Sequence, residues 1–64
     1  MAHFAVNVQE PGANAVIVTE YDDCDDAYRG FALAIGNGKP GTAVKLFIER
    51  KCYSSCIVQD YRQG

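Results

Sequence analysis

One stretch with helical periodicity, placed between segments that alternate, most constrains how this chain can fold. From Cys24 onward the apolar residues fall on one face of a helix with 3.6 residues per turn: Cys24, Ala27, Tyr28, Phe31 and Ile35. Residues 3–9 and 42–50 instead carry apolar side chains at every second position, which is typical of half-buried strands. The sequence therefore predicts one amphipathic helix that packs against a sheet.

The helix is predicted near residues 23–36, and its first turn is rich in aspartate. Asp22 or Asp23 can accept backbone N–H bonds as the N-cap, and the neighbouring carboxylates suit the positive end of the helix dipole. Gly30 in the middle costs about 1 kcal/mol of helix propensity relative to alanine. A glycine at that position would allow the helix to approach the sheet closely.

The glycine-rich segment "GNGKPGT" is interpreted as the exit of this helix. Gly36 or Asn37 can adopt the left-handed conformation that closes many helices, and Pro40 prevents the helix from continuing. The segment is not a phosphate-binding loop, because the Walker pattern needs Ser or Thr directly after Lys39, where Pro40 stands. Its glycines also follow a helix, so no helix N-terminus would face a phosphate.

Four strands are predicted around the helix. Pro and Gly in "EPGAN" favour a type II turn over Glu10–Ala13, which joins a strand at 3–9 to a returning strand at 14–21. The second hairpin pairs 42–50 with 56–61 through a three-residue loop, Tyr53-Ser54-Ser55. A tighter turn at Arg50-Lys51 is the alternative, and it would shift every cross-strand pair.

The predicted order is ββαββ, an α+β fold in which an antiparallel sheet of two hairpins packs one face against one amphipathic helix. The 64 residues leave room for a single small domain, residues 1–64. A chain of this length buries only roughly 60% of the surface that its unfolded form exposes. Small domains often depend on a disulfide, a metal or a partner subunit for further stability.

The aspartates and cysteines do not compose a convincing metal site. An EF-hand loop begun at Asp22 would place Cys24 at a ligand position and lack its glycine at position 6. A zinc site of Cys24, Cys52, Cys56 and His3 and a Cys52–Cys56 cross-strand disulfide both stay open. Reduced, packed thiols are preferred, and no metal ion or cofactor is predicted.

Neither a catalytic site nor a complete RNA-binding motif is present. "RGFA", Arg29–Ala32, matches the start of the RNA-recognition-motif signature, but Leu33 and Gly36 stand where the base-stacking aromatics belong. His3 is the only histidine, and it has no evident carboxylate or nucleophile partner. We therefore predict that the protein is not an enzyme and has no catalytic residues.

Charge is unevenly distributed along the chain. Residues 1–28 carry −6 and residues 29–64 carry +4, giving a net charge of −2. Such asymmetry can mark a basic binding face or a head-to-tail self-contact, unless the fold mixes the two halves. The N-terminus lacks the features of a signal peptide, and the longest apolar run, 15–18, is too short to span a bilayer. A cytoplasmic location and no membrane partner are expected.

The sheet face opposite the helix is the predicted binding surface. It should carry Asn7, Gln9, Lys45, Phe47, Glu49 and Tyr61, with Phe47 opposite Tyr61, and Tyr21 is a further candidate. We predict that this open face, or an edge strand, binds another protein or a second copy of the chain, as small phage or mobile-element modulators do. A module for single-stranded nucleic acid, which uses the basic C-terminal hairpin, is the alternative. The candidate partner-binding residues are Lys45, Phe47, Arg50, Lys51, Tyr61 and Arg62.

Overall fold

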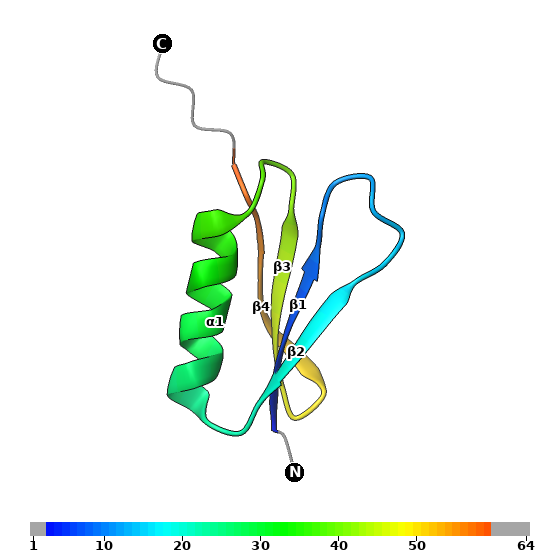
Figure 1. Cartoon of the computed structure of the whole chain (residues 1–64). Coiled ribbons are helices and arrows are strands. Elements are labelled where there is room, and N and C mark those ends of the chain that lie inside the picture. Colours follow the sequence, from blue (N-terminus) through cyan, green and yellow to red (C-terminus); the bar gives the residue numbers. More distant parts are fainter. Residues whose placement is uncertain (1–2, 60–64) are drawn as a thin grey trace.

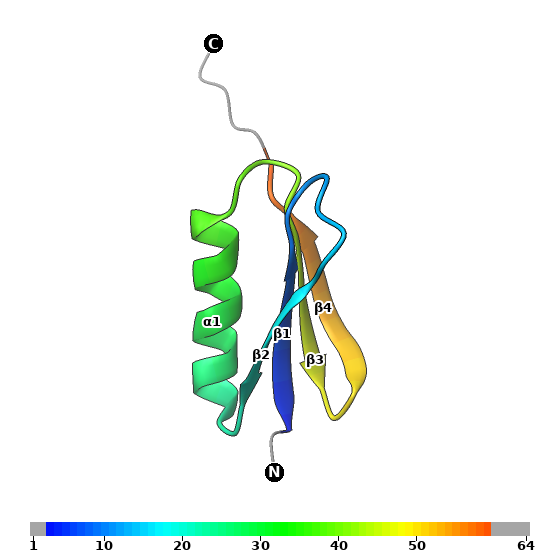
Figure 2. The ribbon, with the colours of Figure 1, turned by 45° about the vertical axis from the view of Figure 1, so that its right-hand side comes forward.

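The structure is a computed structural model that describes residues 3–59, and it has the predicted α+β fold (Figure 1). The elements follow in the order ββαββ: β1 (Phe4–Gln9), β2 (Ile17–Tyr21), α1 (Cys24–Asn37), β3 (Ala43–Ile48) and β4 (Lys51–Ile57). Figure 2 shows the two layers, with α1 on one side and the sheet on the other. Within residues 3–59, no helix is both long and apolar enough to cross a membrane.

All four strands are antiparallel and form one sheet in the order β2-β1-β3-β4. The two predicted hairpins are joined at the centre by β1 and β3, which pair from Phe4 opposite Ile48 to Gln9 opposite Ala43. This junction leaves β2 and β4 as the two edges of the sheet. Strand order could not be read from the sequence, because periodicity assigns a face to each residue but does not choose a neighbour.

A small core lies between α1 and the two central strands. Val6, Ala27, Val44 and Leu46 are at most 3% exposed, and they are the buried hydrophobic residues of the described chain. The alternating patterns of β1 and β3 produce this core, because every second side chain points toward α1. Partly buried residues complete it: Phe4, Val8, Tyr21, Phe31, Ala34, Ile35 and Val58.

The first turn is confirmed, but β2 begins later than predicted. The Ala13 N–H donates to the Glu10 carbonyl at 3.1 Å, and Gly12 has φ +79°, as a type II turn requires. The predicted strand began at residue 14, whereas β2 begins at Ile17. Its pairing with β1 runs only as far as Val8 opposite Ile17, so the residues before Ile17 have no strand partner.

The helix begins and ends one residue later than predicted. Its N-cap is one of the two predicted aspartates, although the predicted side-chain hydrogen bond is not formed, and the predicted left-handed residue is not found at its C-terminus. Asp23 is the N-cap with an extended backbone, but its side chain accepts no capping hydrogen bond. Its backbone carbonyl accepts from the Ala27 N–H at 3.0 Å. At the other end Gly38, with φ −74°, replaces the expected left-handed residue. A Cβ at Gly38 would lie 2.8 Å from the Ala34 carbonyl oxygen, so close packing is what requires glycine there.

The predicted loop of the second hairpin is wrong. The turn lies at Glu49 and Arg50, whose φ values of 50° and 69° are those of a two-residue hairpin turn, and Ile48 pairs with Lys51. The residues predicted as a loop, Tyr53-Ser54-Ser55, lie within β4, where a register shift accommodates an extra residue.

The cysteines are therefore placed differently from the prediction. Cys52 lies opposite Phe47 and Cys56 opposite Val44, so the two cysteines share one strand and no cross-strand disulfide joins them. All three cysteines are free. Cys24 and Tyr28, predicted on the buried side of the helix, are exposed, because α1 turns Ala27 and Phe31 toward the core instead.

Candidate protein-binding surface

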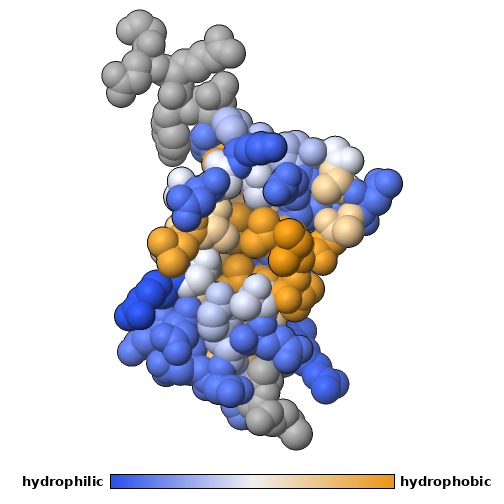
Figure 3. All heavy atoms as spheres, in the orientation of Figure 1, coloured by the Kyte–Doolittle hydropathy of each residue, from blue (hydrophilic) through white to orange (hydrophobic). Residues whose placement is uncertain are grey.

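The edge strand β2 and the residue just before it, Val16, expose a continuous run of aliphatic side chains. Val16, Ile17 and Val18 are 45%, 61% and 54% exposed. Residues opposite each other in an antiparallel pair share a face. Ile17, opposite Val8, therefore lies on the helix side of the sheet, and Val18, opposite Asn7, lies on the open side. Figure 3 shows apolar surface at mid-height of the molecule, in the region of α1 and β2.

The backbone of β2 is also available. β2 pairs with β1 on one side only, so its outward N–H and C=O groups have no strand partner in the described chain. Natural edge strands are usually protected by lysine, proline or a bulge. The other edge, β4, begins with Lys51 and has a register shift, whereas β2 has neither and carries Glu20 as its one charge. Of the two edges, β2 is the one left open to strand addition.

The open face adjoining β2 is a shallow trough. The central strand β1 places the small side chains of Ala5 and Asn7 on this face, between larger side chains of β2 and β3. A hollow of about 390 Å³ lies there, lined by His3, Phe4, Ala5, Asn7, Val18, Glu20, Phe47 and Arg50. A second hollow of about 90 Å³ is lined by Asn7, Gln9, Val16, Ala43, Lys45 and Phe47. Because Val16 and Val18 line these hollows, the trough and the β2 edge form one continuous surface.

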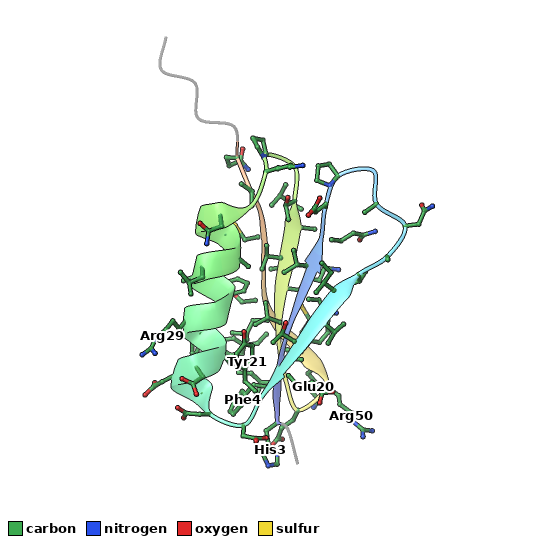
Figure 4. All side chains as sticks on the ribbon, in the orientation of Figure 1. His3, Phe4, Glu20, Tyr21, Arg29 and Arg50 are labelled. Atoms are coloured by element: carbon green, nitrogen blue, oxygen red, sulfur yellow. The ribbon has the colours of Figure 1, made fainter. Side chains whose placement is uncertain are left out.

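Opposite charges line the two sides of the trough. Glu20 comes from β2, whereas Lys45 and Arg50 come from the second hairpin. Figure 4 shows Glu20 and Arg50 near the same end of the sheet, with His3 below them. The one ion pair among residues 3–59 joins Arg29 to Asp26 at 4.0 Å, and both of those side chains are exposed. The charges of the trough are therefore not neutralised within the described chain.

Several predicted site residues do lie together. Lys45 and Phe47 are on the open face, and Arg50 lines the same hollow as Phe47. Lys51 begins β4, beyond the turn. Tyr61 and Arg62 lie outside the described residues.

Two residues predicted on the open face are elsewhere. Glu49 lies in the tight turn, and Tyr21 points to the helix side, where Figure 4 shows it between the sheet and α1. Sequence reasoning also missed the run Val16–Val18 as part of the candidate surface. Its signal was present as three consecutive aliphatic residues, but their exposure depends on β2 being an edge.

A second exposed aromatic group lies on the opposite side of the sheet. The rings of Tyr28 in α1 and Tyr53 in β4 contact edge to face, with centroids 6.4 Å apart. A hydrogen bond with the Tyr53 side chain, together with desolvation and nearby negative charge, raises the pKa of Tyr28 above its ordinary value. This contact ties α1 to the outer strand and removes Tyr53 from the open face.

Comparisons with protein families, curated proteins and solved structures found no significant match to this chain. Within residues 3–59, no group of three or more His, Cys, Asp or Glu side chains is placed to hold a metal ion. His3, Cys24, Cys52 and Cys56 therefore do not converge on a zinc site. The surface formed by β2 and the trough is the candidate functional site.

Proposed function

We propose that this chain is a non-enzymatic protein-binding domain, and that its partner adds a strand to the β2 edge. The observation that carries the proposal is the exposed run Val16–Val18, at the start of an edge strand that has no lysine, proline or bulge. An added strand would pair with the outward backbone groups of β2. Its side chains would cover Ile17 on one face and Val18 on the other.

The size of the apolar run indicates how large the contact must be. Fully burying an aliphatic side chain contributes about 1.5–3 kcal/mol. Val16, Ile17 and Val18 are each about half exposed, so covering all three contributes about 3 kcal/mol in total. Association costs at least about 4 kcal/mol. The run alone is therefore insufficient, and backbone hydrogen bonds and the adjoining trough must contribute to binding.

The trough would fix the orientation of a bound partner. Phe47 lines both hollows and offers an aromatic surface at the centre of the face. Glu20 on one side and Lys45 and Arg50 on the other would discriminate between the two directions in which a charged partner could lie. Lys51, Tyr61 and Arg62 stay predicted partner-binding residues of this chain.

Binding of single-stranded nucleic acid is the second candidate, because Lys45 and Arg50 are placed with Phe47 around the trough. This arrangement resembles an aromatic platform with phosphate-neutralising neighbours. Two features weigh against it. Tyr53 contacts Tyr28 on the other side of the sheet, and Glu20 would repel phosphates from the larger hollow.

The test uses the immobilised full chain and two matched variants. Val18→Lys introduces a charge on β2, whereas Leu33→Lys introduces the same charge on α1 at a residue of similar exposure, 57% against 54%. We expect the wild type and Leu33→Lys to retain the same protein from a lysate of the source cells, and Val18→Lys to lose it. Far-UV circular dichroism checks that both variants fold.

Two results would overturn the proposal. Equal retention by all three baits would show that the β2 edge is not the binding site. Retention of nuclease-sensitive material, released at moderate salt concentration, would favour the nucleic-acid alternative instead.

A further inference from the structure

We infer that the strand added at β2 is the β2 strand of a second copy, in an antiparallel pair related by a two-fold axis. The inference rests on the proposed function, and it names the partner. The result would be one continuous eight-stranded sheet, because each copy contributes its four strands. An axis perpendicular to the sheet reverses strand direction and keeps the same face, so both α1 helices would cover the same side.

A second copy suits the surface because each copy leaves the same apolar side chains uncovered. The described chain buries only four hydrophobic side chains, and it leaves Val16, Ile17 and Val18 largely uncovered. A two-fold contact places the same patch of both copies at the interface, so one pairing covers both runs at once. Small domains commonly obtain missing burial by association with another subunit.

Antiparallel geometry leaves only a few registers. Residues directly opposite each other must point to the same face. In a symmetric β2–β2 pair, this condition places the two-fold axis at a residue and not between two residues. A centre at Glu20 would set two like charges directly opposite each other, so the remaining centres within the exposed part of the strand are Ile17, Val18 and Thr19.

The apolar pattern selects Ile17 as the centre. In that register Ile17 lies opposite Ile17 of the partner subunit, and Val16 lies opposite the partner's Val18. Every aliphatic residue of the run then faces another aliphatic residue. Centring on Val18 would place Val16 opposite the partner's Glu20, and centring on Thr19 would place Val18 opposite the partner's Glu20.

The charge pattern excludes Thr19 as the centre. With Ile17 at the axis, Glu20 and the partner's Glu20 lie six positions apart along the pair, which is about 20 Å at 3.4 Å per residue. With Thr19 at the axis, they lie only about 7 Å apart. The Debye length at physiological ionic strength is about 8 Å, so repulsion is screened in the first register and not in the second.

The first test measures the mass of the full chain by sedimentation equilibrium. We expect about 14 kDa for the wild type, twice the 7.0 kDa of one chain. Ile17→Lys would face its own copy across the axis, so we expect this variant to sediment at 7.0 kDa. Leu33→Lys, at a residue of similar exposure on α1, should stay at about 14 kDa, twice 7.0 kDa.

The second test determines the register by cross-linking. Cys24, Cys52 and Cys56 are replaced by serine, and single cysteines are introduced as Ile17→Cys, Val18→Cys or Thr19→Cys. A residue on the axis meets its own copy, so mild oxidation should yield a covalent dimer from Ile17→Cys alone. A dimer in which Val18→Cys or Thr19→Cys cross-links instead, or in which none of the three does, would overturn the Ile17 register.

Failure of this inference is distinguishable from failure of the proposed function. A wild-type mass of 7.0 kDa excludes the second copy as the partner. If a protein is still captured in a Val18-dependent manner, the β2 edge binds a different chain and the proposed function stands. If neither a dimer nor Val18-dependent capture is found, both are wrong.

Discussion

The phenol of Tyr21, at the end of β2, lies directly against the backbone of Gly30 in α1. A Cβ added at Gly30 would fall 2.7 Å from Cζ of Tyr21, closer than real side chains approach. The absence of a side chain at Gly30 therefore allows the ring to fill the space between the helix and the edge strand. This contact holds the end of β2 against α1, next to the candidate binding surface.

Gly30→Ala should destabilise the protein even though alanine favours helix. The propensity gain is about 1 kcal/mol, whereas forcing an extra group into a packed contact costs about 1–3 kcal/mol. Because the neighbouring atoms belong to the ring of Tyr21, the ring or the helix must move. We expect a net loss of about 1 kcal/mol in the free energy of unfolding, measured by urea denaturation.

Gly36→Ala is the matched control in the same helix. No atom lies within 4 Å of a Cβ built at Gly36. The substitution should raise the free energy of unfolding by about 0.5–1 kcal/mol. If both variants were stabilised equally, the close contact between Gly30 and Tyr21 would be refuted.

Thr42→Val should stabilise the fold. Thr42 is 1% exposed, and its hydroxyl has no hydrogen-bond partner in the described structure. Its backbone bonds, from its N–H to the Lys39 carbonyl and from the Val58 N–H to its carbonyl, do not depend on the side chain. Valine has nearly the same shape, so removing the unpaired hydroxyl should add about 1–2 kcal/mol to the free energy of unfolding.

Thermal unfolding measures this effect, and Thr19→Val on the exposed strand β2 is the comparison. There the hydroxyl is exposed to water, so we expect a change within about 0.5 kcal/mol. A loss of stability in Thr42→Val would indicate that the hydroxyl has a bonding partner.

The turn between β3 and β4 should accept Asn-Gly with a gain in stability. Glu49 and Arg50 both have positive φ, at 50° and 69°, which is unfavourable for residues with a Cβ. Asn-Gly is the preferred pair for this two-residue turn. We expect Glu49→Asn with Arg50→Gly to raise the free energy of unfolding by about 1–2 kcal/mol.

The control for this pair is Asn-Gly introduced two residues later, at Lys51 and Cys52. Those residues belong to β4, so the shifted pair should destabilise the hairpin. Stabilisation by the shifted pair would contradict a turn at Glu49 and Arg50.

The contact between Tyr28 and Tyr53 predicts a pH dependence. The pKa of Tyr28 is raised in the fold, mainly by its hydrogen bond with Tyr53, so the fold favours the neutral phenol. The resulting stability is present below the ordinary tyrosine pKa and is lost as the pH rises through the raised value. Tyr53→Phe should lower the Tyr28 pKa toward its ordinary value, as followed by NMR titration of the Tyr28 ring.

Tyr21→Phe is the control for that titration, because Tyr21 lies against Gly30, whereas Tyr28 contacts Tyr53. It should leave the pKa of Tyr28 unchanged. An unchanged Tyr28 pKa in Tyr53→Phe as well would show that the two phenols do not interact.

Local patterns in the sequence were sufficient for the type and order of the elements. The alternation of Val44 and Leu46, the helical spacing of Ala27 and Phe31, and the Pro-Gly turn before Ala13 all predicted what the structure shows. Each of these signals depends on residues within one element, where periodicity alone decides which side is buried. For that reason the ββαββ order and the two faces of β3 were predictable.

Long-range packing decided the rest. The start of β4 at Lys51 depends on its pairing with β3, which overrode the loop-like sequence Tyr53-Ser54-Ser55. The exit of the helix at Gly38 depends on how closely Val58 approaches that residue. Such contacts join residues far apart in the chain, and no local pattern records them.

The candidate site likewise depends partly on local sequence and partly on tertiary packing. Its residues were readable as aliphatic Val16–Val18 on a strand and as Lys45 and Phe47 on an open face. Their role as an exposed edge beside a trough exists only because β1 joins β3 and leaves β2 outermost. The sequence determined the chemistry of each strand, whereas the choice of central strands determined which of those side chains meet solvent, because exposure depends on neighbours that local periodicity does not specify.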